Sequence, residues 1–175
     1  MFVVLVTGPP GSGKTATLTA LLDALAESKI PHAGVDVDEL SWAFPFPDLS
    51  QRCEHLRAWR NSHARAGASL LIVAEVIESP AHLADVLAAL GADEHTVVSL
   101  QADLATLRAR IIEREPDGWF GLGHLLGETE RLAASTNSLG DVHLVFDTTH
   151  SSAGEVASAI RSARPDVLMS APPVN

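Results

Sequence analysis

The stretch Gly8-Pro9-Pro10-Gly11-Ser12-Gly13-Lys14-Thr15 decides the fold, because it matches the phosphate-binding loop pattern G-x-x-x-x-G-K-[ST] in full. Residues 2–6 before it are apolar and rich in valine, which predicts a buried parallel strand. Residues 16–27 after it repeat leucine on one helical face, which predicts a helix that packs on the sheet. An ordinary glycine turn between a strand and a helix needs neither Lys14 nor Thr15. This order of elements therefore indicates a nucleotide-phosphate site.

The residue types in this loop suit the binding of phosphate. Glycines let the backbone curl around an anion, so that its N–H groups and the helix N-terminus point at phosphate oxygens. Lys14 adds a cation, and the Thr15 hydroxyl is placed to ligate Mg²⁺. We therefore expect Gly8 through Thr15, together with Ala16, to bind a nucleotide and its magnesium ion.

Composition places the chain among globular proteins and excludes several function classes. Its 175 residues are 46% hydrophobic and 19% charged, which suits one domain with a sizeable core. The net charge of −10 argues against a duplex nucleic-acid binder, because such proteins need a basic surface. The lone Cys53 excludes an intrachain disulfide and suits a reducing cytosol. The apolar run at residues 2–6 is too short for a signal peptide or a membrane span, so we expect a cytoplasmic protein. The oligomeric state stays open.

Strand and helix signals alternate along the whole chain, which predicts an α/β fold with a mainly parallel five-stranded sheet and helices on both faces. Strands are expected at residues 2–6, 33–37, 70–74, 96–100 and 142–146. Capping signals for the helices stand at Asp48, Ser79-Pro80, Asp103 and Ser152, and stop signals at Gly67, Gly91 and Pro116. We expect one domain over residues 1–164 with a small helical lid at about 114–135. Residues 165–175 show little periodicity, which predicts a loosely ordered tail.

Two carboxylates follow the second expected strand. Asp36 and Asp38 fall at the carboxyl edge of the sheet, where ligands bind in open α/β folds. A carboxylate there would accept a proton from an attacking hydroxyl or help to hold Mg²⁺. The alternative is that Asp38 only caps a short turn, and the spacing does not decide between the two.

Glu75 follows the third expected strand directly. Phosphate-loop enzymes usually carry at this point an acidic group that positions the metal through water. The longer glutamate side chain would reach a substrate as readily as the metal, so both roles stay open.

A pair of arginines marks the fourth helix. Arg110 and Arg114 are four residues apart and share one helical face, which suits them to spread phosphoryl charge. Pro116 and the glycine-rich residues 118–123 follow, which favours a mobile lid. The alternative is an exposed arginine face.

The region after the two carboxylates offers candidates for the acceptor side of a site. Trp42, Phe44 and Phe46 would build a rigid wall for a ring-bearing or sugar substrate, or would pack within their own loop. Arg60 and His63 continue the apolar face of the helix that begins after Asp48, where they would line a cleft or extend from the rim of the core.

The remaining histidines give no metal signature. His82, His95 and His143 are scattered without metal-ligand spacing, so the sequence predicts no zinc site.

Four motifs together carry a family resemblance over about residues 1–164. They are the Gly8–Thr15 loop, Asp36-x-Asp38, Leu107-x-x-Arg110-x-x-x-Arg114 and Asp147-Thr148-Thr149. With them the chain resembles the small P-loop kinases of the nucleoside monophosphate kinase-like group. Within that group it is similar to the chloramphenicol-type antibiotic phosphotransferases, gluconate kinase, adenylylsulfate kinase and the zeta-toxin-like families.

The resemblance implies a role for each motif. Lys14 and Thr15 would hold the β- and γ-phosphates and Mg²⁺. Asp38 would orient or deprotonate the acceptor hydroxyl, with Asp36 as the second candidate. The remaining implied roles are those of Arg110 and Arg114, which would contact the nucleotide and the transferring phosphoryl group, and of Asp147, Thr148 and Thr149, which would lie beside the adenine.

The chain also departs from these families in two places. Val37 stands where several of them carry a glycine, and the segment after Arg114 lacks their substrate signatures, so the identity of the acceptor does not carry over.

We therefore expect an ATP-dependent, Mg²⁺-requiring kinase that transfers the γ-phosphate to a hydroxyl of a small-molecule acceptor. One alternative is a nucleoside or nucleotide kinase, whose anionic acceptor would be held by the arginine-bearing helix that begins after Asp48. The other is a nucleotide-binding switch or regulatory ATPase. A guanine-reading [NT]-K-x-D motif is absent, because the chain has no lysine after Lys29.

Overall fold

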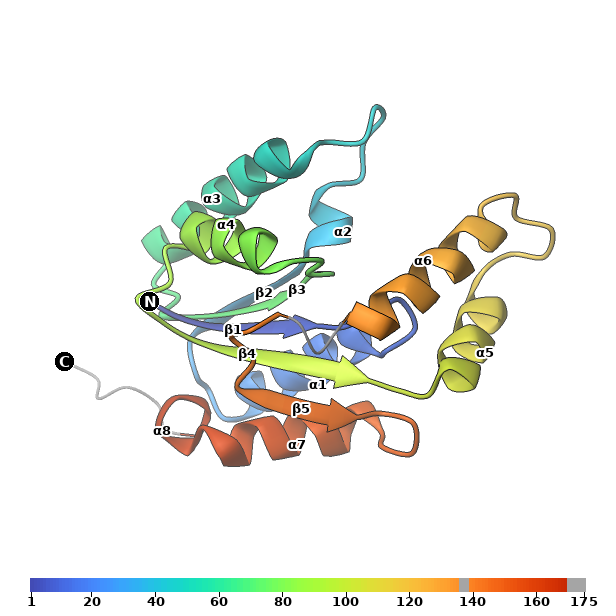
Figure 1. Cartoon of the computed structure of the whole chain (residues 1–175). Coiled ribbons are helices and arrows are strands. Elements are labelled where there is room, and N and C mark those ends of the chain that lie inside the picture. The colour runs from blue at the N-terminus through green and yellow to red at the C-terminus, as the bar shows by residue number, and fades with distance from the viewer. Residues whose placement is uncertain (136–138, 170–175) are drawn as a thin grey trace.

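The computed structural model describes residues 1–135 and 139–169 (Figure 1). Five parallel strands form one sheet in the order β2-β3-β1-β4-β5. They are β1 (Phe2–Thr7), β2 (His32–Asp36), β3 (Leu70–Ala74), β4 (Glu94–Gln101) and β5 (Leu144–Asp147). The α/β class and the five-stranded parallel sheet expected from the sequence are confirmed.

Helices cover both faces of this sheet (Figure 1). On one face lie α1 (Lys14–Glu27), α7 (Ala153–Ala163) and α8 (Pro165–Leu168), and on the other lie α3 (Leu49–Arg65) and α4 (Pro80–Leu90). The alternation of side chains along a strand produces two separate cores. In β1, Val4 and Val6 pack against α1 and α7, whereas Val3 and Leu5 pack against α3 and α4.

The capping signals in the sequence are used as expected. Asp48 and Ser152 each form a capping box, Ser79 and Asp103 cap α4 and α5 (Leu104–Arg114), and Gly91 ends α4 in the left-handed conformation. The strand bounds differ in places. β4 begins two residues earlier than expected because its first residue, Glu94, aligns with Phe2 of β1. β5 begins two residues later because it pairs with β4 only from Leu144 onward.

The chain after α7 differs from the expected loose tail. Residues 165–168 form α8, and Leu168 is fully buried in the core beneath α1 and α7. Arg164 holds this turn in place, because its Nη1 donates to Thr96 Oγ1 at 2.8 Å and its guanidinium lies 4.5 Å from the centre of the Phe2 ring. Residues 170–175 lie outside the described part of the chain.

A helical arm projects from the carboxyl edge of the sheet, where all five strands end (Figure 1). It consists of α5 and α6 (Leu122–Ser135), which pack against each other and are joined by an ion pair between Arg108 and Glu130. A second ion pair, between Arg131 and Glu78 at 2.7 Å, connects α6 to the segment after β3. None of the helices within the described ranges is long and apolar enough to cross a membrane.

Candidate active site

The glycine loop after β1 approaches its neighbours too closely for larger residues. Gly8 has φ +151°, and a Cβ there would lie 2.3 Å from the Leu100 carbonyl oxygen. Gly13 has φ +93° in the left-handed region and begins α1 as its N-cap. The loop therefore closes against β4 and aims the N-terminus of α1 at the carboxyl edge, which is the geometry of an anion site.

Lys14 lies almost buried beneath this loop, with 9% of its surface exposed. Its Nζ donates to the carbonyl oxygens of Gly8 at 3.0 Å and Pro9 at 3.3 Å. Burial lowers the pKa of Lys14 by desolvating the ammonium group, and the nearby carboxylates of Asp38, Asp36 and Glu75 oppose this shift. The loop thus holds one cation among acidic groups in a poorly solvated position.

Thr15 and Asp36 form the second element of the site. Thr15 Oγ1 donates to Asp36 Oδ2 at 2.6 Å, and Asp36 is nearly buried at the end of β2. Asp36 also caps α2 (Val37–Leu40), since its Oδ1 accepts the backbone N–H of Asp38 at 3.2 Å. The alternative in which Asp38 is the capping residue is therefore wrong. Within the described residues, the Asp38 carboxylate makes no hydrogen bond.

The oxygen groups of this cluster fit a magnesium ion. Thr15 and Asp36 both line a cavity of about 400 Å³ over the loop, which we name the phosphate cavity, and a hydroxyl beside a carboxylate is the hard-oxygen donor set that Mg²⁺ prefers. Thr15 therefore stays the candidate metal ligand that the sequence predicts, and the structure adds Asp36 beside it as a second candidate.

Glu75 lies at the end of β3 and is 3% exposed. Burial raises the pKa of Glu75 to about 7, although Arg52 and Lys14 pull it down. Arg52 Nη1 lies 3.1 Å from Glu75 Oε1 and connects the first turn of α3 to β3. Glu75 is not among the residues that line the cavities described below.

The two arginines of α5 make different contacts. Arg110 donates to the Gly11 carbonyl oxygen at 3.2 Å, to Thr148 Oγ1 at 3.1 Å and to the Thr148 carbonyl oxygen at 2.6 Å. Arg114 is 60% exposed and its guanidinium lies 2.6 Å from Glu115 Oε1. Both line the phosphate cavity, so their shared helical face does point at one place.

The segment after β5 braces the loop from the other side. Thr148 is buried, and its hydroxyl lies 3.0 Å from the Ser12 carbonyl oxygen and 3.1 Å from the Gln101 carbonyl oxygen. Asp147 Oδ1 accepts the N–H of Thr149 at 2.8 Å, and Thr149 Oγ1 accepts the N–H of Asp103 at 3.0 Å. These bonds fix the segment after β5 against the loop and α5. Thr148 lines a cavity described below, whereas Asp147 and Thr149 line none of the three.

Three neighbouring cavities follow the carboxyl edge. The first, of about 310 Å³, lies between the loop and α7 and is lined by Ser12, Gly13, Ala16, Thr17, Arg110, Thr148, Ser151, Ser152, Ala153 and Val156. The second, of about 400 Å³, is the phosphate cavity and is lined by Pro10, Gly11, Gly13, Lys14, Thr15, Ala16, Asp36, Asp38, Val76, Arg110, Arg114 and Leu125. The third, of about 450 Å³, is lined by Asp38, Glu39, Ser41, Trp42, Phe46, Pro47 and Arg52. Arg110 belongs to the first two cavities and Asp38 to the last two.

Comparison with known proteins identifies the fold. No family model and no curated protein matches the sequence. Among solved structures, a sugar kinase from Janibacter sp. HTCC2649 superposes with a TM-score of 0.65 at 17% identity, with 95% of each chain covered. The tunicamycin resistance protein of Deinococcus radiodurans has a TM-score of 0.65 at 20% identity over 98% of each chain. The APS kinase of Mycobacterium tuberculosis, in complex with AMPPNP and APS, has a TM-score of 0.56 at 23% identity, with 96% of this chain and 97% of that chain covered.

This chain has an α/β P-loop NTPase fold, which it shares with these solved structures. In open parallel sheets of this kind, ligands bind outside the carboxyl ends of the strands. The three cavities lie at that edge of the sheet.

The structure does not bring every expected residue to this edge. Arg60 lies against Gly91, where a Cβ on the glycine would be 2.3 Å from its Nη2, and this places Arg60 near the amino edge of the sheet. Phe44 is 96% exposed and is not among the residues that line the cavities, whereas Trp42 and Phe46 line the third cavity.

Arg52 is the residue that the sequence analysis passed over. The apolar stripe of α3 singled out Arg60 and His63, but α3 enters the fold from the carboxyl edge, so its first turn lies nearest the cavities. The direction of α3 could have identified Arg52 from the sequence. A helix that follows a strand of a parallel sheet begins at the carboxyl edge, and its early residues are the ones within reach of the site.

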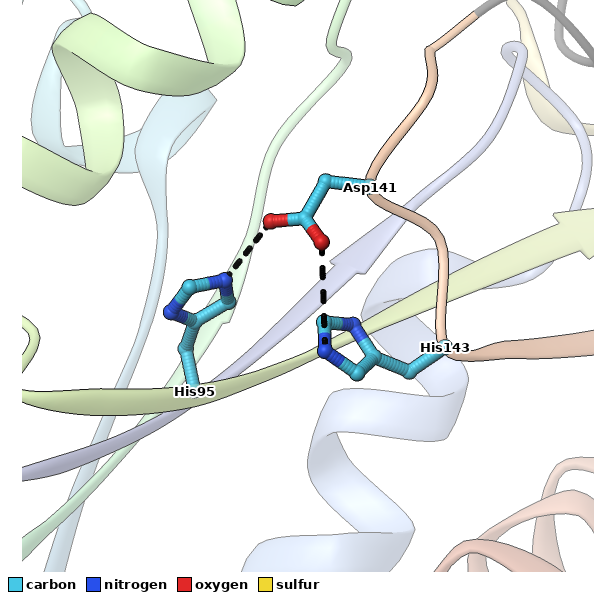
Figure 2. Close-up of side chains that lie close together, drawn as sticks. All are labelled: His95, Asp141 and His143. Atoms are coloured by element: carbon cyan, nitrogen blue, oxygen red, sulfur yellow. Dashed lines mark hydrogen bonds and ion pairs between the residues drawn. The ribbon is translucent and has the colours of Figure 1, made fainter.

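A cluster of His95, Asp141 and His143 corrects the view that these histidines are scattered (Figure 2). Asp141 lies between the two rings, with its carboxylate oxygens 2.8 Å from His95 Nε2 and 3.9 Å from His143 Nε2. The hydrogen bond from His95 lowers the pKa of Asp141. His143 Nδ1 accepts the N–H of Val97 at 3.2 Å, which leaves the proton of the neutral ring on Nε2. A protonated Nε2 does not ligate a metal, so this geometry describes a carboxylate held by two imidazoles at the amino edge.

Proposed function

We propose that this protein is an ATP-dependent, Mg²⁺-requiring kinase that transfers the γ-phosphate to a hydroxyl group of a small molecule. One observation carries the proposal. Asp38 is the residue shared by the phosphate cavity and the third cavity, which we name the acceptor cavity. A carboxylate at that junction, without a hydrogen-bond partner among the described residues, is available to an acceptor hydroxyl.

The nucleotide would occupy the first two cavities. Its adenine would lie between the loop and α7 beside Thr148, and its phosphates would lie over Lys14. Thr15, with Asp36 beside it, would hold a magnesium ion, which when bound supplies charge neutralisation between the β- and γ-phosphates. Arg110 would hold the loop in position through its bonds to Gly11 and Thr148.

Transfer joins the acceptor to the γ-phosphoryl group. The acceptor hydroxyl oxygen forms a bond to the γ-phosphorus, the bond from that phosphorus to the β–γ bridging oxygen breaks, and ADP leaves. Asp38 accepts the hydroxyl proton, while Lys14 and the exposed Arg114 stabilise the charge on the phosphoryl oxygens. The α5–α6 arm carries Arg114, and we propose that its closure as a lid excludes water from this step.

An assay of phosphate transfer from Mg·[γ-³²P]ATP tests the proposal. The acceptor panel contains nucleosides, nucleoside monophosphates, sugars, sugar acids, amino sugars and hydroxylated antibiotics. We expect transfer to at least one class, lost in both Lys14→Ala and Asp38→Asn. ATP hydrolysis that needs no acceptor and is unchanged in Asp38→Asn would contradict the proposal and favour a nucleotide-dependent switch.

A further inference from the structure

We infer that the acceptor is an uncharged or positively charged hydroxylated molecule with an apolar face, and that the site selects against anionic acceptors. The inference rests on the proposed function, because it assigns a substrate class to the acceptor cavity. It is carried by the charges on the wall of that cavity and by the exposed aromatic rings beside them.

The charges on the wall are mainly acidic. Asp38 and Glu39 line the acceptor cavity, and among its lining residues Arg52 is the one cation. The Arg52 guanidinium is already paired, at 3.1 Å, with the buried carboxylate of Glu75. An anionic acceptor would have to compete for this arginine while its own charge approached Asp38, Glu39 and the γ-phosphate. Juxtaposed like charges disfavour such a ligand.

The other cations of α3 do not line this cavity. Arg57 lines a separate cavity beside Cys53 and Asp85. Arg60 lies against Gly91 near the amino edge of the sheet, and Arg65 is the last residue of α3. The arginines of α5 line the phosphate cavity, where the nucleotide would occupy them. The described residues thus leave no unpaired cation on the acceptor wall.

The apolar part of the wall indicates the shape of the acceptor. Trp42 is 85% exposed and Phe46 is 75% exposed, and both line the cavity together with Pro47. Burial of exposed aromatic rings against a ligand is favourable, and a ring also attracts a nearby ammonium group. A molecule that places a hydroxyl at Asp38 and an apolar face on these rings contacts both the acidic and the aromatic part of the wall favourably. An amine on it would meet Asp38 or Glu39.

Matched probes that share a carbon skeleton and differ in the charge of one substituent test the inference. One set is glucosamine, glucose and glucuronate, which all keep the pyranose ring, and the other is phenylalaninol, 3-phenylpropane-1,2-diol and phenyllactate. Each is titrated by calorimetry into protein saturated with Mg·AMPPNP. We expect the neutral or amine-bearing member of at least one set to bind about tenfold or more tightly than the carboxylate member. Tightest binding of a carboxylate member, equal binding within both sets, or no binding by any probe would each overturn the inference.

The same experiment distinguishes a failure of the proposed kinase function from a failure of this inference. Absence of Mg·AMPPNP binding would contradict the kinase itself. The charge ranking is then measured on the protein alone, because Asp38, Glu39 and the Arg52–Glu75 pair belong to the chain and not to the nucleotide.

A substitution of Glu75 sharpens the test. Glu75→Gln removes the buried carboxylate that occupies Arg52, so the guanidinium becomes available to an anion. We expect the affinity for the carboxylate probes, relative to the neutral probes, to rise about tenfold. Glu54→Gln on the exposed face of α3 is the matched control, and it should leave this ratio unchanged. An unchanged ratio in Glu75→Gln would mean that the pairing of Arg52 does not set the charge preference.

Discussion

The two edges of the sheet carry similar ionisable residues, but these residues differ in how far they are buried. At the carboxyl edge, Lys14, Asp36 and Glu75 are buried or nearly so, and burial shifts the pKa of Lys14 downward and that of Glu75 upward to about 7. At the amino edge, His95 and Asp141 are partly or largely exposed, and they pair with each other. Both edges collect charge, but the acidic groups Asp36 and Glu75 at the carboxyl edge are buried, whereas Asp141 at the amino edge is exposed.

This difference separates the proposed active site from a structural contact. Burying ionisable groups costs stability, and a fold keeps them where they act on a ligand. Exposed pairs such as His95–Asp141 contribute little and need no ligand to satisfy them. Substitutions at the carboxyl edge should therefore change chemistry and pH dependence, and those at the amino edge should change neither.

The largest expected effect comes from Lys14→Ala. Loss of the cation beneath the loop should lower kcat for phosphate transfer by about 10²–10³-fold, the range seen when one charge-stabilising donor is removed. Folding should be little affected, because Nζ bonds only to loop carbonyl oxygens that water can reach in its absence. Steady-state kinetics and a denaturant titration measure the two quantities. Lys29→Ala, in the exposed turn after α1, is the control and should behave as the wild type. Equal losses of activity in both variants would contradict the assignment.

Asp38→Asn should rank next. Loss of the carboxylate that we propose as the acceptor of the hydroxyl proton is expected to lower kcat by about 10²-fold or more while nucleotide affinity stays unchanged. Asp36→Asn is the matched variant, and it should instead raise the Mg²⁺ concentration needed for half-maximal activity, because Asp36 holds Thr15. Metal titrations of both variants separate the roles. If Asp36→Asn abolished turnover at saturating Mg²⁺ and Asp38→Asn did not, the base would be Asp36.

Glu75→Gln should change how stability depends on pH. The folded pKa of about 7 lies above the ordinary value of 4.5, so the folded state binds the proton more tightly than the unfolded state. This group therefore makes the free energy of unfolding fall as the pH rises from about 4.5 to 7, by about 3 kcal/mol in all. In Glu75→Gln this decrease in the free energy of unfolding should be absent. Denaturant titrations from pH 5 to pH 8 measure it, and parallel curves for variant and wild type would show that Glu75 is not desolvated.

The smallest effect is expected at the amino edge. Asp141→Asn should lower the free energy of unfolding by less than about 1 kcal/mol, because the pair with His95 is partly exposed. The pKa of Asp141 is lowered in the folded state, so its contribution is present at neutral pH and is lost as the pH falls below the ordinary value of 3.8. Thermal unfolding at pH 7 and pH 3 measures the difference. Phosphate transfer should be unchanged, and a large loss of transfer would mean that the two edges are coupled.

The features predicted correctly from the sequence are those coded by neighbouring residues. The phosphate-binding loop, the five strands and the helix caps each depend on a pattern within about a dozen residues, and all appear in the structure. The buried α8 turn was missed because four residues carry no periodicity. Leu168 is held by packing against α1 and α7, which only the folded chain reveals.

The features predicted wrongly or left open depend on contacts across the fold. The sequence left open that Asp38 caps a short turn, whereas Asp36 is the cap because its backbone is extended, which spacing does not encode. Arg52 lines the acceptor cavity and Arg60 does not, because the first turn of α3 is the end that lies near the cavity. His95 and His143 are 48 residues apart in the chain and meet because the backbone of His143 bonds to Val97, which lies in β4 two residues after His95.

A crystal structure with Mg·AMPPNP and a bound acceptor probe tests the central claim most directly, namely that Asp38 joins the phosphate cavity to the acceptor cavity. We predict the γ-phosphate between Lys14 and Arg114, the metal on Thr15, and the acceptor hydroxyl within hydrogen-bond reach of Asp38, about 2.6–3.2 Å. A γ-phosphate directed away from Asp38, or an acceptor bound outside the wall of Trp42 and Phe46, would contradict the account.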